Sequence, residues 1–263
     1  MIAEIRQKEK AALLFAGWEE TMIWSCLQGI MGHVYGDDGD APVSAMALLG
    51  DFCFFTGKPC RELVQYKPGH CRQDFVIMVP RDENWAGMIE ECFPSTGNYP
   101  LAKKVARYAI RKEPDIFRGE VLERLKTAVA ALPEEYELKM MDEELFLRCG
   151  KIPWCRDWVS QYEDYELYRE YGLGVVILKD GEPVSGASSY SGYRGGIEIE
   201  IDTREDYRRK GLACVCGAKL ILECRKRGWY PSWDAQNPWS VALAEKLGYH
   251  FDHAYTAYEV YGW

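Results

Sequence analysis

The segment from Ile197 to Arg227 constrains the fold more than any other part of the chain. It begins with Ile197-Glu-Ile-Glu-Ile-Asp202, in which apolar and acidic residues alternate strictly. Such alternation is typical of a β-strand with one buried face. A helical pattern from Gly211 to Arg227 follows after a short charged loop. A strand that leads through a loop into a helix indicates a layered α/β domain.

The loop within this segment, Thr203 to Ala213, has the features of an anion-binding site. The first amides of a helix have no acceptor within the helix, and the helix N-terminus carries partial positive charge. Gly211 allows a ligand to approach the backbone closely. Eight basic and three acidic residues lie between Arg204 and Arg227, a local charge of +5, whereas the whole chain has 32 − 41 = −9. We interpret the loop as a phosphate cradle, with an ordinary basic helix as the plainer alternative.

The other patterns of the C-terminal half complete an α/β layered domain. Its predicted elements are a strand Tyr136–Met141, an aromatic-rich helical region from about Leu145 to Tyr171 with Asp142 as N-cap, strands Gly174–Leu178 and Pro183–Ser189 joined by the turn Lys179–Glu182, a strand Tyr230–Trp233, a helix Pro238–Leu247 with Gly248 as C-cap, and strands up to Trp263.

The N-terminal half mixes helical and strand patterns. The predicted elements are a helical region Lys8–Met31, strands Val43–Thr56 and Asp74–Pro80, and helices Glu83–Cys92 and Gly119–Leu132. Pro133 ends the last of these helices, and a strand pattern follows it. We therefore predict two domains, residues 1–132 of mixed α/β structure and residues 133–263, with no flexible linker between them.

Two segments of the C-terminal half resemble a known family. Arg208-Arg-Lys-Gly211-Leu-Ala213 is similar to the Q/R-x-x-G-x-G/A signature of the GNAT superfamily of acyl-CoA N-acyltransferases. The segment from Asn237 to Tyr249 resembles the second cofactor segment of that superfamily, which typically ends in Leu-Gly-aromatic. The resemblance covers about Glu135 to Trp263. Within the superfamily, the chain resembles the zwittermicin-resistance-like acetyltransferases.

This resemblance implies an α/β (α+β) fold, in which a mixed, mostly antiparallel sheet splays open and is flanked by helices. The N-terminal domain is then either a degenerate GNAT-like copy or an unrelated cap. The pantetheine arm of acetyl-CoA would lie between the strands Ile197–Thr203 and Tyr230–Asp234, and its pyrophosphate would lie on the amides of Arg208 to Ala213. The cofactor-binding residues implied are Ile201, Thr203, Arg208, Arg209, Lys210, Gly211, Leu212, Ala213, Asn237 and Ser240. For Asn237 and Ser240 the alternative is a local role, a turn and a helix cap.

Acyl transfer to an amine needs a base for the nitrogen, a donor for the oxyanion and a proton for the leaving thiolate. Glu198 and Glu200 share one face of the predicted strand, and either is a candidate base, directly or through water. The alternative is that both belong to the polar face of a half-exposed strand. Many superfamily members carry a tyrosine as general acid in the last helix, where this chain has Ala244.

Three other side chains near these segments are assigned structural roles. Tyr249 closes the Leu-Gly-aromatic motif and is predicted to lie in the core. Cys214 and Cys216 fall in the first turns of a helix, where the pKa of a thiol can be lowered. An acyl-cysteine intermediate is therefore an alternative mechanism, but we predict that both thiols are structural.

The aromatic and acidic segment from Trp154 to Tyr168 corresponds to the region that covers the acceptor site in the superfamily. We predict that Trp154, Trp158 and Tyr162 bind the substrate, because aromatic rings and carboxylates suit a cationic amine. The alternative is an amphipathic helix whose aromatic side chains pack on the sheet.

Composition excludes several other classes of protein. The acidic balance argues against nucleic-acid binding, and no apolar stretch approaches the ~20 residues that span a membrane. The ten cysteines form no C-x-x-C pair and the first ten residues are highly charged, so we expect a cytoplasmic protein with reduced, mostly buried thiols. No metal site is expected, since His250 and His253 fall on opposite faces of a strand.

The resulting hypothesis is an N-acetyltransferase that moves an acetyl group from acetyl-CoA to a primary amine of a small molecule, by direct transfer in a ternary complex. The alternative is a non-catalytic acyl-CoA-binding or regulatory protein with the same fold. A nucleotide-phosphate binder unrelated to acyl transfer would leave the segment from Asn237 to Tyr249 unexplained. The oligomeric state is left open, with a homodimer as one option.

Overall fold

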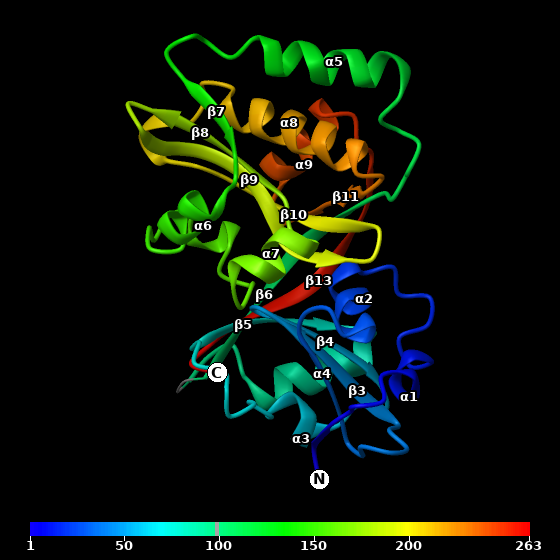
Figure 1. Ribbon diagram of the computed structural model, residues 1–263. Coiled ribbons are helices and arrows are strands. Elements are labelled where there is room, and N and C mark those ends of the chain that lie inside the picture. Colours follow the sequence, from blue (N-terminus) through cyan, green and yellow to red (C-terminus); the bar gives the residue numbers. More distant parts are fainter. Residues whose placement is uncertain (98–99) are drawn as a thin grey trace. The chain divides into compact units, whose positions relative to one another are not determined.

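The computed structural model describes residues 1–97 and 100–263, which form two compact units (Figure 1). One unit comprises Met1–Arg107 and Ala254–Trp263, and the other comprises Tyr108–His253. The division therefore differs from the predicted boundary at Pro133. The physical reason is helix α5 (Gly119–Ala130), whose Leu125 is buried in the core of the second unit.

The second unit contains a five-stranded sheet in the order β11-β10-β9-β8-β7. Strands β10 and β11 are parallel, and the other neighbours are antiparallel. Its elements after α5 are β7 (Glu137–Met140), α6 (Glu143–Cys149), the 3-10 helix η1 (Arg156–Trp158), α7 (Tyr165–Tyr171), β8 (Gly174–Lys179), β9 (Glu182–Tyr193), β10 (Gly196–Thr203), the 3-10 helix η2 (Glu205–Tyr207), α8 (Leu212–Lys226), β11 (Tyr230–Ser232), β12 (Asp234–Ala235) and α9 (Pro238–Lys246).

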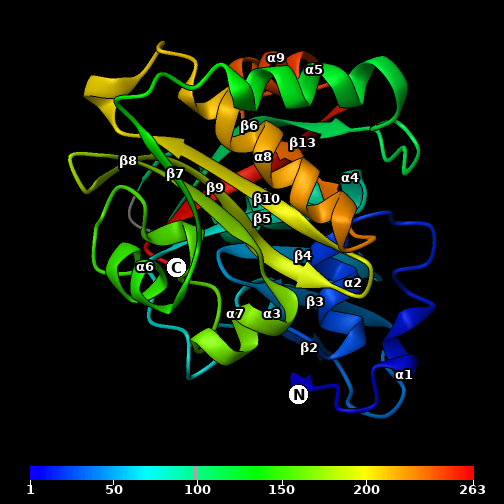
Figure 2. The same ribbon diagram turned by 45° about the horizontal axis from the view of Figure 1, so that its top comes forward.

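The alternation along β10 decides what covers each face of this sheet. Ile197 and Ile199 pack in the core with α8, which α5 covers in turn (Figure 2). Glu198, Glu200 and Asp202 therefore face the opposite side. On that side Trp158 of η1 packs against the sheet, and its ring occupies the space where a Cβ of Gly186 would lie.

The predicted helical region Leu145–Tyr171 is divided into α6, η1 and α7. Asp142 and Asp164 are the N-caps of α6 and α7, and each accepts a hydrogen bond from an amide three residues later, at 2.9 and 2.8 Å. A second cap in the middle of the region starts a new helix, so one continuous helix does not form.

The other sheet has eight strands in the order β1-β2-β3-β4-β5-β13-β6-β12, and the first unit contributes most of them. Its elements are β1 (Ala3–Glu4), α1 (Glu9–Ala12), α2 (Thr21–Gln28), β2 (His33–Gly36), β3 (Ser44–Leu49), β4 (Phe52–Gly57), α3 (Arg61–Val64), β5 (Phe75–Pro80), α4 (Glu83–Cys92), β6 (Leu101–Ile110) and β13 (Phe251–Tyr261), of which β6 and β13 continue into the second unit. The predicted strand Val43–Thr56 is thus a hairpin of β3 and β4. Strands β2 and β6 were not predicted.

The two halves of the chain repeat one order of elements. Both read β-α-α-β-β-β-α-β-α-β, from β1 to β6 and from β7 to β13, if the short η1, η2 and β12 are set aside. In both, the third and fourth strands are antiparallel and a helix then leads to a parallel strand. Of the two options for the N-terminal half, this repeat favours the degenerate copy over the unrelated cap.

The halves also exchange their last strands. β13, the last strand of the second half, pairs with β5 in the first unit, with Tyr258 opposite Met78. β6, the last strand of the first half, pairs with β12 in the second unit, with Ala109 opposite Asp234. Each unit is therefore completed by a strand from the other half of the sequence.

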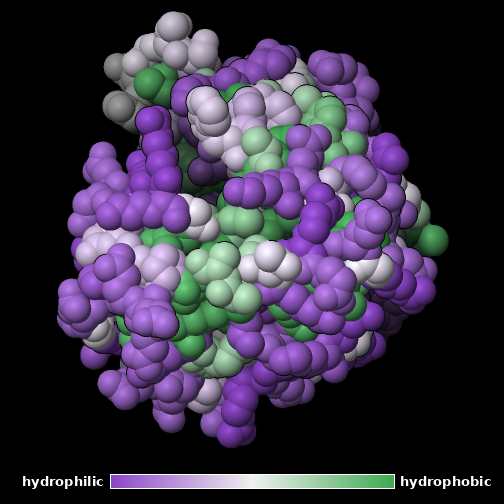
Figure 3. Space-filling view, turned by 90° about the horizontal axis from the view of Figure 1, so that it is seen from above, coloured by the Kyte–Doolittle hydropathy of each residue, from purple (hydrophilic) through white to green (hydrophobic). Residues whose placement is uncertain are grey.

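The ten cysteines all lie in the described ranges, and none forms a disulfide; seven are buried and three are half-buried. The face seen in Figure 3, on which α5 lies, carries mainly hydrophilic residues with hydrophobic ones between them. No helix in the described residues is long and apolar enough to cross a membrane.

Candidate active site

The site begins where β10 and β11 part. Their pairing runs from Gly196 opposite Tyr230 to Glu198 opposite Ser232. Beyond Ser232 the chain joins the other sheet as β12. Within the described part of the chain, β10 therefore has an open edge from Ile199 to Thr203.

The backbone of β10 offers hydrogen-bonding groups to this open edge. The amide of Arg204 donates to the carbonyl of Val184 on β9 at 2.9 Å. Because backbone groups alternate along an antiparallel strand, those of Thr203 and Ile201 point away from β9, toward the open edge. Arg208 agrees with this orientation, since its Nε donates to the Thr203 carbonyl at 3.3 Å. An extended ligand can thus lie along the edge like an added strand.

The loop before α8 presents amides that are free to bind an anion. Among the described residues, the backbone amides of Arg209 to Ala213 have no acceptor, and the first α8 amide that has one belongs to Cys214, which donates to the Gly211 carbonyl at 3.1 Å. Arg209 and Gly211 have φ values of 63° and 81°, in the left-handed region. Successive amides in such a bend form an anion-binding nest. No atom lies within 4 Å of the position that a Cβ would take at Gly211, so a ligand has room there.

The loop also carries the basic side chains. Those of Arg208, Arg209 and Lys210 are exposed, and the Lys210 ammonium lies 4.9 Å from the ring centre of Tyr207. Leu212, by contrast, is 2% exposed and packs in the core. It can therefore contribute only its backbone to a ligand, as can Ala213.

Asn237 and Ser240 form a local cap at the start of α9. The Asn237 Oδ1 accepts from the Ser240 amide at 2.9 Å, and the Ser240 hydroxyl oxygen accepts from the indole of Trp233 at 3.1 Å. These contacts fit the alternative in which Asn237 and Ser240 act locally, as a turn and a helix cap. Within the described residues, these contacts do not use the side-chain amide nitrogen of Asn237 or the hydroxyl proton of Ser240.

Glu198 is the most enclosed of the candidate bases. It is 4% exposed and lies between Ser191 on β9 and Ser232 on β11. Burial and, less strongly, the nearby Glu198 charge raise the pKa of Tyr193, and burial raises that of Tyr230 to about 12. Both hydroxyls therefore stay neutral beside this carboxylate.

Asp202 belongs to the same acidic face and was missed as a site residue. It is two residues beyond Glu200 on the same strand, so the two side chains project from one face of the sheet. Burial is the largest influence on the pKa of Asp202 and raises it. Glu200 lowers this pKa, Asp157 raises it, and Trp158 and Arg208 lower it, so that the net shift is upward. The sequence signal was present, because Asp202 occupies the third acidic position of the alternating strand.

Ala244, at the position of the superfamily tyrosine, is fully buried in the core of the second unit. Tyr249 is also in the core, as predicted, and its hydroxyl donates to the Pro231 carbonyl at 2.6 Å. Cys214 is 9% exposed and Cys216 is 0% exposed. Burial raises the pKa of Cys216 to about 12, which disfavours a nucleophilic thiolate there.

The three predicted substrate contacts differ in exposure. Trp158 is 0% exposed and its ring packs against the sheet at Gly186. The buried hydroxyl of Tyr162 donates to the Ser189 hydroxyl at 2.8 Å. For Trp158 and Tyr162, these contacts fit the alternative in which the aromatic side chains pack on the sheet. Trp154 is half-buried and packs edge-on against Trp158, with ring centres 5.1 Å apart, so part of its surface remains available to a ligand.

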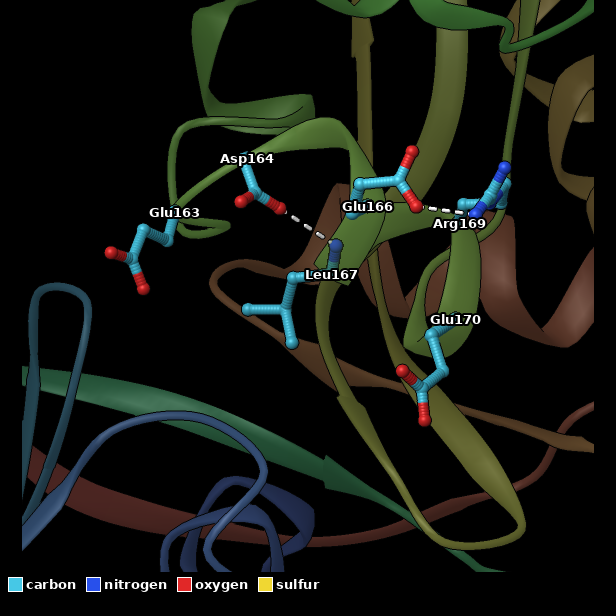
Figure 4. Close-up of a pocket in the computed structure, with 6 residues that line it drawn as sticks. All are labelled: Glu163, Asp164, Glu166, Leu167, Arg169 and Glu170. Atoms are coloured by element: carbon cyan, nitrogen blue, oxygen red, sulfur yellow. Dashed lines mark hydrogen bonds and ion pairs between the residues drawn. The ribbon is translucent and has the colours of Figure 1, made fainter.

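An acidic surface pocket of about 500 Å³ lies at the start of α7 (Figure 4). Its lining residues are Glu163, Asp164, Glu166, Leu167, Arg169 and Glu170. Asp164 is engaged as the cap of α7, and Glu166 forms an ion pair with Arg169. These internal contacts reduce the charge that the pocket can offer to a cation.

The described residues of the first unit do not form the corresponding features. Its parallel pair β4 and β5 stays joined from Phe52 opposite Ile77 to Phe55 opposite Pro80. The helix that follows β4 is the short α3, and its N-cap is Cys60 instead of a left-handed glycine. The open edge and the free amides thus occur together in the second unit.

Comparison with known proteins agrees with this geometry. The model of the family described as GNAT acetyltransferase matches residues 12–258. The chain belongs to the GNAT acetyltransferase family. The match includes most of the N-terminal half, so the resemblance seen in the sequence from about Glu135 onward extends through both units.

Relatives of known sequence or structure support the same placement. An uncharacterized N-acetyltransferase of Bacillus subtilis strain 168, YdfB, is 26% identical over 252 residues, which is 90% of this chain and 89% of that protein. A crystal structure of a GCN5-related N-acetyltransferase-like protein from Streptococcus suis 89/1591 is 45% identical, with a TM-score of 0.88 over 97% of this chain and 98% of that chain. The predicted fold class is thereby confirmed, and the protein is an acetyltransferase.

A tandem GNAT protein from the clavulanic acid biosynthesis pathway shares the fold at 11% identity, with a TM-score of 0.54 over 100% of this chain and 98% of that chain.

Proposed function

We propose that the protein transfers an acetyl group from acetyl-CoA to a primary amine of a small molecule. One observation carries the proposal: the open edge of β10 runs directly into a loop with free amides. The edge suits an extended, amide-containing arm and the loop suits a pyrophosphate. Acetyl-CoA contains both groups in that order.

In this proposal the pantetheine arm hydrogen-bonds to the backbone of Ile201 and Thr203. The pyrophosphate lies on the amides from Arg209 to Ala213, with the side chains of Arg208, Arg209 and Lys210 as charged partners. Asn237 and Ser240 contact the arm from α9 through the groups that their cap leaves free.

Glu198 is the proposed base, because it lies at the last paired position before the strands part. It accepts a proton from the amine nitrogen, directly or through water, as the nitrogen attacks the thioester carbonyl. The backbone amide of Ile201 at the open edge donates to the developing oxyanion. Transfer is direct, within a ternary complex, since Cys216 is buried with a raised pKa and is unsuited to carry the acetyl group.

For the acceptor we propose that Trp154 contacts the amine substrate, that Trp158 supports the Trp154 ring by packing on it, and that Tyr162 belongs to the same substrate-binding region. An aromatic ring beside the acidic face of β10 suits a cationic amine. Membership in the zwittermicin-resistance-like subgroup, a cytoplasmic location and a homodimer belong to the same proposal.

Calorimetry with acetyl-CoA tests the cofactor site. Wild type is expected to bind saturably, and Gly211→Leu is expected to lose at least tenfold in affinity, because the side chain fills the cradle. Gly228→Leu is a matched control at the other end of α8. Its φ is 68° against 81° at Gly211, and neither Cβ position has an atom within 4 Å. Equal binding by the two variants would show that the pyrophosphate lies elsewhere.

Release of CoA thiol with a panel of primary amines separates catalysis from mere binding. We expect turnover with at least one amine and a loss of about 10²-fold or more in kcat for Glu198→Gln. Saturable binding of acetyl-CoA without turnover across the panel would favour the alternative, a non-catalytic acyl-CoA-binding protein.

A further inference from the structure

Strand β9 carries four buried serines, and the hydroxyl of one of them lacks a hydrogen-bond partner. The four, each 0% exposed, are Ser185, Ser188, Ser189 and Ser191. Three of these hydroxyls have a partner at 2.7 or 2.8 Å, as in Ser189, which accepts from the hydroxyl of Tyr162. Within the residues that the structure describes, the Ser191 hydroxyl has none.

A buried hydroxyl group without a hydrogen bond destabilises the folded protein, because it has given up its hydrogen bonds to water. Native structures contain few such groups, and a role in catalysis or binding is one reason to retain one. The surroundings of Ser191 therefore indicate which group its hydroxyl would bind.

Ser191 lies beside the proposed base. β10 lies between β9 and β11 (Figure 1), and Ser191 of β9 is directly opposite Glu198 of β10. Side chains in this relation point to the same face of a sheet, with Cβ atoms about 4.5–5.5 Å apart. Glu198 also holds the last position at which β10 pairs with β11, opposite Ser232. Ser191 therefore borders the point where the strands part and where the proposed reaction takes place.

The pairing of β9 with β10 changes directly beside Ser191. The register shifts between Glu198 and Ile199, so that Ser189 is the next paired residue of β9, opposite Ile199. A bulge of this kind changes the direction of the side chains near it. Beyond the shift, the partners of the serine hydroxyls come from the segment that covers the sheet, namely the Trp158 carbonyl and the Tyr162 hydroxyl. The shift thus separates the packed part of β9 from the part that borders the site.

The chemistry of an amine accounts for a hydroxyl at this position. A neutral primary amine has one lone pair and two N–H groups. In the proposed reaction the lone pair points to the thioester carbon and one N–H points to Glu198. The second N–H then needs an acceptor, because Glu198 is only 4% exposed and little water reaches this place. A serine hydroxyl oxygen is such an acceptor.

We propose that Ser191 is a further substrate-binding residue, whose hydroxyl oxygen accepts a hydrogen bond from the second N–H of the acceptor amine. This inference rests on the proposed function. The second N–H stays on nitrogen and becomes the N–H of the acetamide product. A secondary amine has a single N–H and leaves the buried Ser191 hydroxyl without a partner, so the site selects primary amines.

The first test measures stability without any substrate. Ser191→Ala removes a hydroxyl that has no partner in the free protein, so its Tm is expected to rise by about 2–4 °C. Ser189→Ala is the matched control, a buried serine of the same strand whose hydroxyl is hydrogen-bonded, and its Tm is expected to fall by a similar amount. A Tm of Ser191→Ala below that of wild type overturns the inference, because the hydroxyl then has a partner in the folded protein.

The second test measures selectivity by thiol release, with the best primary amine of the panel and its N-methyl derivative. Where the derivative is not turned over, it serves as a competing ligand. We expect Ser191→Ala to lose about tenfold or more in kcat/KM for the primary amine, and less than twofold in kcat/KM or affinity for the N-methyl derivative. Because steric effects of the methyl group act on both enzymes, the change in the ratio isolates the N–H contact.

These outcomes separate the inference from the function on which it rests. Ser191→Ala with wild-type kcat/KM and an unchanged ratio overturns the role of Ser191 while the acetyltransferase proposal stands. A wild type that does not bind acetyl-CoA, or that turns over no amine, overturns both. A Kd of Ser191→Ala for acetyl-CoA within twofold of wild type excludes a folding defect as the cause of lost turnover.

Discussion

At the scale of single residues, identical chemistry takes different roles according to its neighbours. Glu198 and Glu200 are two residues apart on one strand face, yet Glu198 is buried between Ser191 and Ser232, whereas Glu200 is half-buried and lies beyond the last position paired with β11. Carboxyl groups in unlike surroundings have unlike proton affinities, so the two residues are not equivalent candidates for the base.

Ala244 gives a prediction at this scale. Because it is 0% exposed, Ala244→Tyr forces a large side chain into a packed core. We expect the free energy of unfolding to fall by about 1–3 kcal/mol or more, and kcat not to rise. Urea denaturation measures this against Ala242→Tyr, an exposed position on the same helix. Equal stability of the two variants would mean that the core around α9 can expand.

At the scale of elements, the two parallel strand pairs of the chain behave differently. β4 and β5 stay paired along their length, whereas β10 and β11 part after Ser232. The difference follows from what the later chain does, since the residues after Ser232 pair with β6 instead of β10. An open edge inside a folded domain leaves backbone groups available, which a ligand can satisfy.

The cap of α9 gives a prediction at this scale. Asn237→Ala removes the acceptor of the Ser240 amide and is expected to cost about 1 kcal/mol of stability. Asp142→Ala removes a similar cap from α6, at 2.9 Å in both cases, and is the matched control. If Asn237 also contacts acetyl-CoA, only its variant weakens binding, by about tenfold in calorimetry. Equal affinities would restrict Asn237 to capping.

At the scale of the whole molecule, the first unit is built from two separate stretches of chain, whereas the second unit is the continuous stretch Tyr108–His253. The last ten residues complete the first unit, where Tyr258 and Val260 are 1% and 0% exposed in its core. Trp263 is 8% exposed in the same core, and its carbonyl accepts from Lys67 at 2.6 Å. The last ten residues are therefore needed to complete the core of the first unit.

Truncation after His253 tests this interdependence. Each buried side chain lost removes about 1.5–3 kcal/mol of hydrophobic stabilisation, so the first unit is expected to lose its cooperative unfolding. Hydrogen exchange at the β5 amides is the measurement, with Tyr261→Ala, a 42% exposed position, as the control. Protection of Val76 to Val79 at the wild-type level would contradict the prediction.

The sequence predicted an element correctly where the features that stabilise it lie within the element itself. The helix Glu83–Cys92 is found within its predicted bounds, because its cap and its apolar face are both local features. β6 was missed since its residues, Leu-Ala-Lys-Lys-Val-Ala-Arg, lack a clear alternation, and pairing with distant strands makes it a strand. The domain boundary was misplaced for the same reason, because the core that holds α5 is formed by later residues.

The sequence by itself determined the local parts of the candidate site: the alternating strand, the basic loop, the glycine before the helix and the helix caps. These depend on residues within a few positions of one another. Only the tertiary structure decided that β10 has an open edge, that Trp158 packs on Gly186 opposite Asp202, and that the two halves exchange their last strands. Such features depend on strand pairing and burial between residues far apart in the chain, which local pattern does not record.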